Sequence, residues 1–218
     1  MKHIYCISGF GSDERMFSKL TFNGFETHFI HWIIPEKNES IVAYAKRLTQ
    51  QIRHNNPILI GLSFGEMMCI EIAKLIPVKK IILISSIKSF HEMPVWLRLS
   101  GKLKLNKIFP MRSFKLIEPL QNYNLSVETS EEKKLVRSYR KNMNQQYADW
   151  AINIILNWKN DEVPENLFHI HGANDRIFPL KKITADHIVK NGGHLMIMNR
   201  YEAVNEYINS ILNLQSEA

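Results

Sequence analysis

The chain has 218 residues, of which 45% are hydrophobic and 22% charged, with a formal net charge of +7. This is the balance of a globular domain, and it excludes a disordered or fibrous chain. The sequence has many basic residues but no nucleic-acid-binding motif, so we expect no nucleic-acid partner. It has no apolar run long enough to span a bilayer, so we expect no stable membrane insertion.

The amino-terminal residues indicate a strand rather than a targeting segment. Residues 1–7 lack the longer apolar run and small-residue cleavage site of a signal peptide. The two cysteines, Cys6 and Cys69, have apolar neighbours typical of buried free thiols, although the sequence alone leaves one disulfide open. We therefore expect a cytoplasmic protein.

Strand and helix patterns alternate in the first part of the chain. The strands are short and apolar, and the helices follow Ser40 and Ser63. Strands that are apolar on both faces and alternate with helices predict a parallel sheet covered on both sides. The predicted strands are 2–7, 27–34, 57–62 and 80–85, and the predicted helices begin near 39 and at 64, the second ending near 75.

The pattern changes after residue 86. Helical stretches dominate 87–160, notably 131–139 and 147–158, and strand patterns return at 167–171 and 184–189 before a last helix at 201–214. We predict an α/β fold with a mostly parallel central sheet flanked by helices. Residues 1–86 and 161–218 form its core, and residues 87–160 form a helical cap or lid inserted into it.

The strongest chemical signal is Gly61-Leu62-Ser63-Phe64-Gly65, which has the pattern G-x-S-x-G. It follows an apolar strand and begins a helix, so the serine is expected on a tight, strained turn with its hydroxyl exposed. A chance glycine-rich turn would fit the five residues alone, but fits less well with this strand and helix around them. Ser63 is therefore the candidate nucleophile.

A serine nucleophile needs a histidine base and a carboxylate that orients the histidine. Among nine histidines, His194 stands out because it follows Asn191-Gly192-Gly193 directly after a short strand. Asp175 lies in a polar loop after the strand 167–171, where an Asx-turn is the alternative interpretation. His171 ends that strand and is expected to pack or to bond locally. The remaining histidines have no comparable setting: His3, His28, His31, His54, His91, His169 and His187.

The loop after the first strand, Ser8-Gly9-Phe10-Gly11, is a candidate oxyanion loop. The backbone N–H groups of Phe10 and Phe64 would both face the developing oxyanion. A simple β-turn is the alternative interpretation of this loop.

These segments together resemble the α/β-hydrolase superfamily over nearly the whole chain. Residues 7–11 resemble its H-G-x-G oxyanion segment, 59–65 its nucleophile elbow, 170–179 its acid loop and 191–194 its G-G-H loop. The resemblance implies a Ser63–Asp175–His194 triad and a helical cap after the strand 80–85. Two departures are Ser8, where histidine is usual, and Glu66, where a second glycine is common.

We expect a serine hydrolase, carboxylesterase-like or thioesterase-like, that cleaves a small acyl substrate without a metal or other cofactor. A carbon–carbon bond hydrolase or lyase on the same scaffold and a non-catalytic ligand-binding protein are the alternatives.

Apolar side chains of the cap could line an acyl pocket or simply pack: Met93, Trp96, Leu97, Leu99, Phe109, Met111 and Phe114. Basic ones could steer an acidic or carrier-bound substrate or form a solvated face: Arg98, Lys102, Lys104, Lys107, Arg112 and Lys115.

Overall fold

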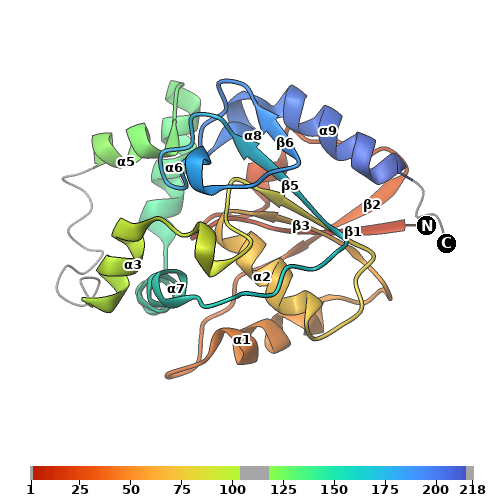
Figure 1. The fold of residues 1–218 in the computed structure, drawn as a ribbon, viewed down its shortest axis with the longest axis horizontal. Helices are drawn as coiled ribbons and strands as arrows, with labels where there is room; N and C mark the ends of the chain where they lie inside the picture. The colour runs from red at the N-terminus through yellow and green to blue at the C-terminus, as the bar shows by residue number, and fades with distance from the viewer. Residues whose placement is uncertain (1, 104–117, 215–218) are drawn as a thin grey trace.

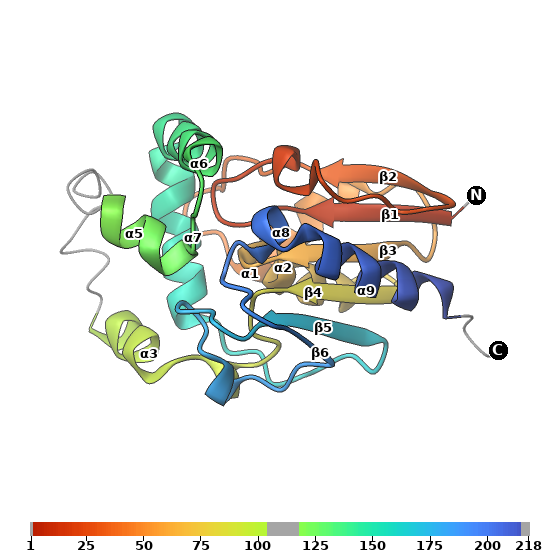
Figure 2. The same ribbon diagram turned by 90° about the horizontal axis from the view of Figure 1, so that it is seen from above.

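Six parallel strands form the centre of the molecule. The structure is a computed structural model, and it describes residues 2–103 and 118–214. Helices cover both faces of this sheet (Figure 1). The strand order is β2-β1-β3-β4-β5-β6, which can be followed in the view from above (Figure 2). The predicted α/β fold with a parallel sheet is therefore confirmed. The strand bounds are Lys2–Ile7 (β1), Phe25–Ile30 (β2), Ile58–Leu62 (β3), Lys80–Ile84 (β4), Leu167–Gly172 (β5) and His187–Val189 (β6).

The strands alternate their side chains between two apolar layers, as the pleat requires. Ile4 and Cys6 of β1 pack on one face of the sheet, whereas Tyr5 and Ile7 pack on the other. The first layer is covered by α8 (Met196–Asn199), α9 (Tyr201–Asn213) and a 3-10 helix (Glu14–Phe17). The second is covered by α1 (Ile41–Leu48) and α2 (Phe64–Ala73).

The described helices between β4 and β5 lie beside the carboxyl ends of the strands (Figure 2). They are α3 (Val95–Lys102), α5 (Glu118–Leu125), α6 (Ser130–Asn142) and α7 (Gln145–Asn157). Thr129 caps α6 in a capping box with Glu132, so this helix begins where the local sequence directs it. The domain division that places a cap at 87–160 stays a prediction.

Two strand boundaries differ from the sequence prediction by three residues or more. Strand β2 ends at Ile30 instead of residue 34, because its partner β1 ends at Ile7, which pairs with Ile30. Strand β6 is limited to three residues because it pairs only with Ile170–Gly172. In both places the reach of the neighbouring strand, and not the propensity of the segment, sets the end.

Two further sequence expectations concern cysteines and membranes. Cys6 and Cys69 are free and buried, as predicted, and burial raises the pKa of both thiols. Among residues 2–103 and 118–214, no helix combines the length and apolar character needed to cross a bilayer.

Candidate active site

Three loops at the carboxyl edge of the sheet carry the candidate catalytic side chains. Ser63 follows β3, Asp175 follows β5, and His194 lies in the loop after β6. Parallel strands present their carboxyl ends at one edge, so residues more than 100 positions apart meet there.

Ser63 sits on a strained turn between β3 and α2. Its backbone angles are φ +51° and ψ −117°, a combination that residues other than glycine rarely adopt. The turn requires the following helix to come very close to β1: a Cβ at Gly65 would overlap the carbonyl oxygens of Ile7 and Ser8. The Ser63 N–H donates to the Ile84 carbonyl oxygen at 2.9 Å, which fixes the turn to β4.

The three polar side chains form one continuous chain of hydrogen bonds. His194 Nε2 lies 3.0 Å from Ser63 Oγ, and His194 Nδ1 lies 2.9 Å from Asp175 Oδ2. His194 and Asp175 are almost completely buried. The carboxylate fixes the tautomer with the proton on Nδ1, so Nε2 has a lone pair for the serine proton.

The surroundings of Asp175 stabilise the ionised form of its carboxyl group. Its Oδ1 accepts from the backbone N–H groups of Ile177 and Phe178, at 2.8 and 2.9 Å. Burial alone would raise the pKa of Asp175. The neighbouring His194 and His171 and the backbone donors outweigh burial and hold the pKa of this carboxyl below its ordinary value.

The acid loop and the histidine loop are bonded to each other through their backbones. The Asn174 N–H donates to the Gly192 carbonyl oxygen at 2.8 Å, and the Ala173 N–H donates to that of Val189 at 3.1 Å. The two loops pack so closely that a Cβ at Gly172 would overlap the Gly192 carbonyl oxygen. This contact sets the position of His194 relative to Asp175.

The predicted oxyanion donors lie on either side of Ser63. Phe64 is the first residue of α2, where helical N–H groups lack intrahelical acceptors. Phe10 belongs to the loop after β1, and that loop approaches the nucleophile closely: a Cβ at Gly9 would lie 3.5 Å from Ser63 Cβ. The rings of Phe10 and Tyr147 stack at 6.0 Å between centroids, which joins this loop to α7.

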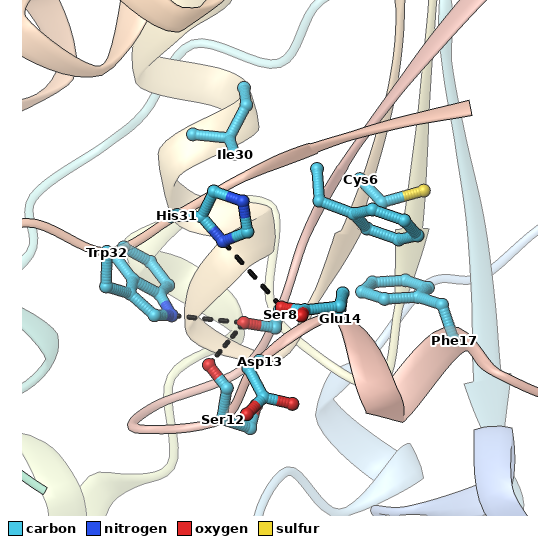
Figure 3. Close-up of a pocket in the computed structure, with 10 residues that line it drawn as sticks. Cys6, Ser8, Ser12, Asp13, Glu14, Phe17, Ile30, His31 and Trp32 are labelled. Atoms are coloured by element: carbon cyan, nitrogen blue, oxygen red, sulfur yellow. Dashed lines mark hydrogen bonds and ion pairs between the residues drawn. The ribbon is translucent and has the colours of Figure 1, made fainter. Parts of the chain in front are cut away.

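Ser8 and Trp32 support the oxyanion loop from behind. Ser8 Oγ donates to the Ser12 carbonyl oxygen at 2.6 Å, and Trp32 Nε1 donates to Ser8 Oγ at 3.2 Å and to the Gly9 carbonyl oxygen at 3.1 Å (Figure 3). This arrangement replaces the histidine of the family pattern at residue 8. No pattern in the sequence points to Trp32, which is 24 residues from Ser8 along the chain.

A cavity of about 190 Å³ lies on the outer side of this loop. It is lined by side chains from β1, β2 and the Glu14–Phe17 helix, and Figure 3 shows His31 and Glu14 facing each other across it. Their closest atoms are 3.7 Å apart. None of the three candidate catalytic residues lines this cavity, so it is separate from the site of chemistry.

Glu66, the second departure from the family pattern, is completely buried in the first turn of α2. Within the described residues neither of its carboxyl oxygens has a hydrogen-bond partner. Burial, with a smaller contribution from Glu92, raises the pKa of Glu66 well above its ordinary value. Burial therefore favours the neutral, protonated form of this side chain, which would place no negative charge near the developing oxyanion.

Two more buried histidines, His169 and His171, lie behind the site. His171 Nε2 lies 2.8 Å from the Phe178 carbonyl oxygen, a local contact of the kind expected from its position. Burial lowers the pKa of His171, and burial together with His171 lowers the pKa of His169 to about 3. Burial therefore favours the neutral form of both rings.

The candidate pocket residues divide into three groups. Met93 is fully buried and packs in the core, whereas Trp96 and Leu99 of α3 are about half exposed. Leu97 is partly buried against the core. Of the basic residues, Arg98 and Lys102 lie on α3. The other predicted pocket and basic residues lie outside the described residues: Lys104, Lys107, Phe109, Met111, Arg112, Phe114 and Lys115.

Comparisons with known proteins agree with this architecture. The sequence matches no protein-family model and no curated protein. Solved structures match over 97–98% of this chain. One is a hydrolase from Pseudomonas aeruginosa PA01, with a TM-score of 0.74, 12% sequence identity and 90% of that chain covered. Another is a thermophilic esterase from Thermogutta terrifontis, with a TM-score of 0.70, 16% sequence identity and 89% of that chain covered. A third is a meta-cleavage product hydrolase from Pseudomonas fluorescens IP01, with a TM-score of 0.68, 16% sequence identity and 91% of that chain covered. The chain has the α/β-hydrolase fold.

Proposed function

We propose that this protein is a serine hydrolase that cleaves a small acyl ester or thioester through an acyl-enzyme intermediate. The observation that carries the proposal is the hydrogen-bonded chain from Ser63 through His194 to Asp175 at the carboxyl edge of the sheet. A strained serine, an oriented base and a buried ionised acid together supply what acyl transfer requires. The esterase and hydrolases among its structural neighbours support the same reaction class.

In the first half-reaction, Ser63 Oγ attacks the acyl carbonyl carbon while His194 Nε2 takes the hydroxyl proton. The N–H groups of Phe10 and Phe64 donate to the oxyanion of the tetrahedral intermediate, and Asp175 stabilises the imidazolium. The bond from carbon to the alcohol or thiol then breaks, and the leaving group takes the proton from His194. Ser63 remains esterified by the acyl group.

In the second half-reaction, water attacks the ester carbonyl of the acylated Ser63. His194 accepts one proton from this water and returns it to Ser63 Oγ as the carbon–oxygen bond to the serine breaks. The carboxylic acid leaves, and the enzyme returns to its starting state. The chain's own residues make every proton transfer in this cycle, so the mechanism uses no cofactor.

We also propose that residues 87–160 act as a cap that shapes the acyl site. Helix α7 contacts the oxyanion loop through Tyr147, whose hydroxyl lies 3.5 Å from the Gly11 N–H. Helix α3, which carries the half-exposed Trp96 and Leu99, lies beside the same edge (Figure 2). The neighbouring Arg98 and Lys102 would favour an acidic or carrier-bound acyl substrate, and a steep fall of kcat/KM with salt on such a substrate tests this.

The deciding experiment compares wild type with Ser63→Ala. Wild type is expected to react with a fluorophosphonate probe and to hydrolyse short p-nitrophenyl esters. Ser63→Ala is expected to lose labelling and at least about 10³-fold in kcat. Ser210→Ala, which changes an exposed serine of α9 whose hydroxyl donates only to the Tyr207 carbonyl oxygen, is the matched control for general loss of hydroxyls. Labelling of folded Ser63→Ala at the wild-type rate would overturn the assignment.

Carbon–carbon bond hydrolysis is the second candidate, favoured by the meta-cleavage product hydrolase among the structural neighbours. Turnover of a meta-cleavage product, with p-nitrophenyl esters left nearly untouched, would favour it over ester cleavage. Ligand binding without labelling or turnover would favour a non-catalytic protein on this scaffold.

A further inference from the structure

Three histidines meet at a place that the proposed reaction does not use. His3 is the second residue of β1, His28 lies on β2, and His54 lies in the loop before β3. The register pairs His3 with Glu26 and Tyr5 with His28, so all four side chains project from the same face of two adjacent strands. This position is toward the amino ends of the strands, away from the edge that carries Ser63.

The ring nitrogens lie at the spacing of metal ligands. One nitrogen from each histidine lies within 4.8 Å of the others, and His3 Nδ1 and His28 Nε2 are 3.1 Å apart. Two ligands on a tetrahedral zinc ion, at 2.0–2.1 Å from the metal, are about 3.4 Å apart. No other group of histidine, cysteine and acidic side chains in 2–103 and 118–214 has this spacing.

Glu26 places a carboxylate beside two of the three rings. Its carboxylate oxygens lie 3.5 Å from His3 Nδ1 and 3.7 Å from His28 Nε2. The side chains of His3, His28 and Glu26 are 18%, 25% and 49% exposed, so an ion has a path from solvent. With three imidazoles already at ligand spacing, a turn of the Glu26 side chain that brings its carboxylate onto the ion would give the four-coordinate donor set that suits zinc.

Tyr5 orients the third histidine from behind. Its hydroxyl lies 2.7 Å from His54 Nδ1 and accepts the Arg53 N–H at 3.0 Å. A partner on Nδ1 leaves Nε2 of His54 to bind a metal, which is the usual outer support of a metal-bound imidazole. The rings of His3 and His54 stack at 3.4 Å with 4° between their planes. Since in-plane lone pairs of parallel rings do not converge, both rings must turn when an ion binds.

We propose that His3, His28, His54 and Glu26 bind one zinc ion that joins β1, β2 and the loop before β3. Because all four positions are filled by protein groups, the site is structural and not catalytic. Its binding energy then stabilises the folded chain, since the unfolded chain does not hold the ligands together.

The test titrates chelator-treated, full-length protein with zinc chloride by isothermal calorimetry. Wild type is expected to bind one equivalent and to show a rise in Tm with zinc. His28→Gln and His54→Gln are expected to weaken binding at least about 100-fold and to lose the rise in Tm. His91→Gln, which changes an exposed histidine outside the cluster, should bind as wild type does. Since His54 is outside the strands, its variant keeps the test valid if His28→Gln does not fold.

Two further readouts separate this site from chance binding. Tetrahedral coordination predicts strong visible absorption when cobalt(II) replaces zinc, and Tyr5→Phe is expected to weaken zinc binding about tenfold through loss of ring orientation. Unchanged one-site affinity in both glutamine variants would overturn the proposal. Wild-type binding only at millimolar zinc would mean adventitious binding and would overturn it equally.

Discussion

The molecule contains two groups of histidines, one at each end of the sheet, and their surroundings differ. At the carboxyl edge, His194 is buried, and each ring nitrogen faces one partner, Asp175 or Ser63. Toward the amino ends, His3, His28 and His54 are partly exposed and face one another. The first environment fixes one proton and one lone pair, which suits proton transfer. The second gathers several lone pairs, which suits a cation.

The backbone around the two groups differs in the same way. The His194 loop is held by backbone hydrogen bonds and by the tight approach of Gly172 to Gly192. The histidines of the amino-end group stand on regular strands and one loop, with a single tyrosine as support. A fixed geometry serves a reaction that tolerates little displacement, whereas ligands that turn onto an ion need some freedom.

The largest expected effect comes from removing the charge that distinguishes the first group. Asp175→Asn keeps the size of the side chain, but its amide can donate to His194 Nδ1 and so favours the wrong tautomer. We expect kcat on p-nitrophenyl esters to fall about 10⁴-fold. Asp161→Asn makes the same change at an exposed position and should keep full activity. A loss of less than tenfold in Asp175→Asn would contradict the assigned role.

The second prediction concerns the contact that positions the histidine loop. In Gly172→Ala the new methyl group overlaps the Gly192 carbonyl oxygen, so the loop must move. We expect a loss of about 1–3 kcal/mol in the free energy of unfolding, together with most of the activity. Gly24→Ala changes a glycine with φ +80° and free space around it. It should cost about 1 kcal/mol of stability and leave kcat unchanged.

The third prediction uses the buried Glu66. The folded state keeps its proton above the ordinary pKa, whereas the unfolded state loses it there. Stability should therefore fall as pH rises from the ordinary pKa towards the raised one. Glu66→Gln removes this effect. The difference in free energy of unfolding between this variant and wild type should therefore rise, in favour of the variant, by up to about 1.4 kcal/mol for each pH unit in that window. Urea unfolding at several pH values measures this, with exposed Glu36→Gln as the control. Parallel pH profiles for wild type and Glu66→Gln would show that Glu66 is ionised in the folded state.

The smallest effect is expected behind the oxyanion loop. Trp32→Phe removes the indole N–H that donates to Ser8 and Gly9. One such bond contributes about 1 kcal/mol, so kcat should fall about fivefold with little change in KM. Trp158→Phe removes an indole donor to Glu71, away from the loop. It should lower stability but not kcat, and an equal fall of kcat in both variants would indicate a general loss of packing.

Much of the carboxyl edge could be predicted from the sequence. Ser63, Asp175 and His194 each follow a strand with a recognisable pattern, and short turns place them at the edge in any parallel sheet. The amino-end histidines carried no such signal. His3 and His28 are 25 residues apart, and only the pairing of β1 with β2 brings them to one face.

By itself, the sequence determined the order of strands and helices, the parallel sheet and the three loop residues at its edge, because local periodicity and turn chemistry encode these features. Only the tertiary structure decided where β2 ends, how Trp32 contacts the loop after β1, that Glu66 is buried, and that three distant histidines lie together. These depend on strand register and on burial, which arise from contacts between residues far apart in the chain. No local pattern carries that information.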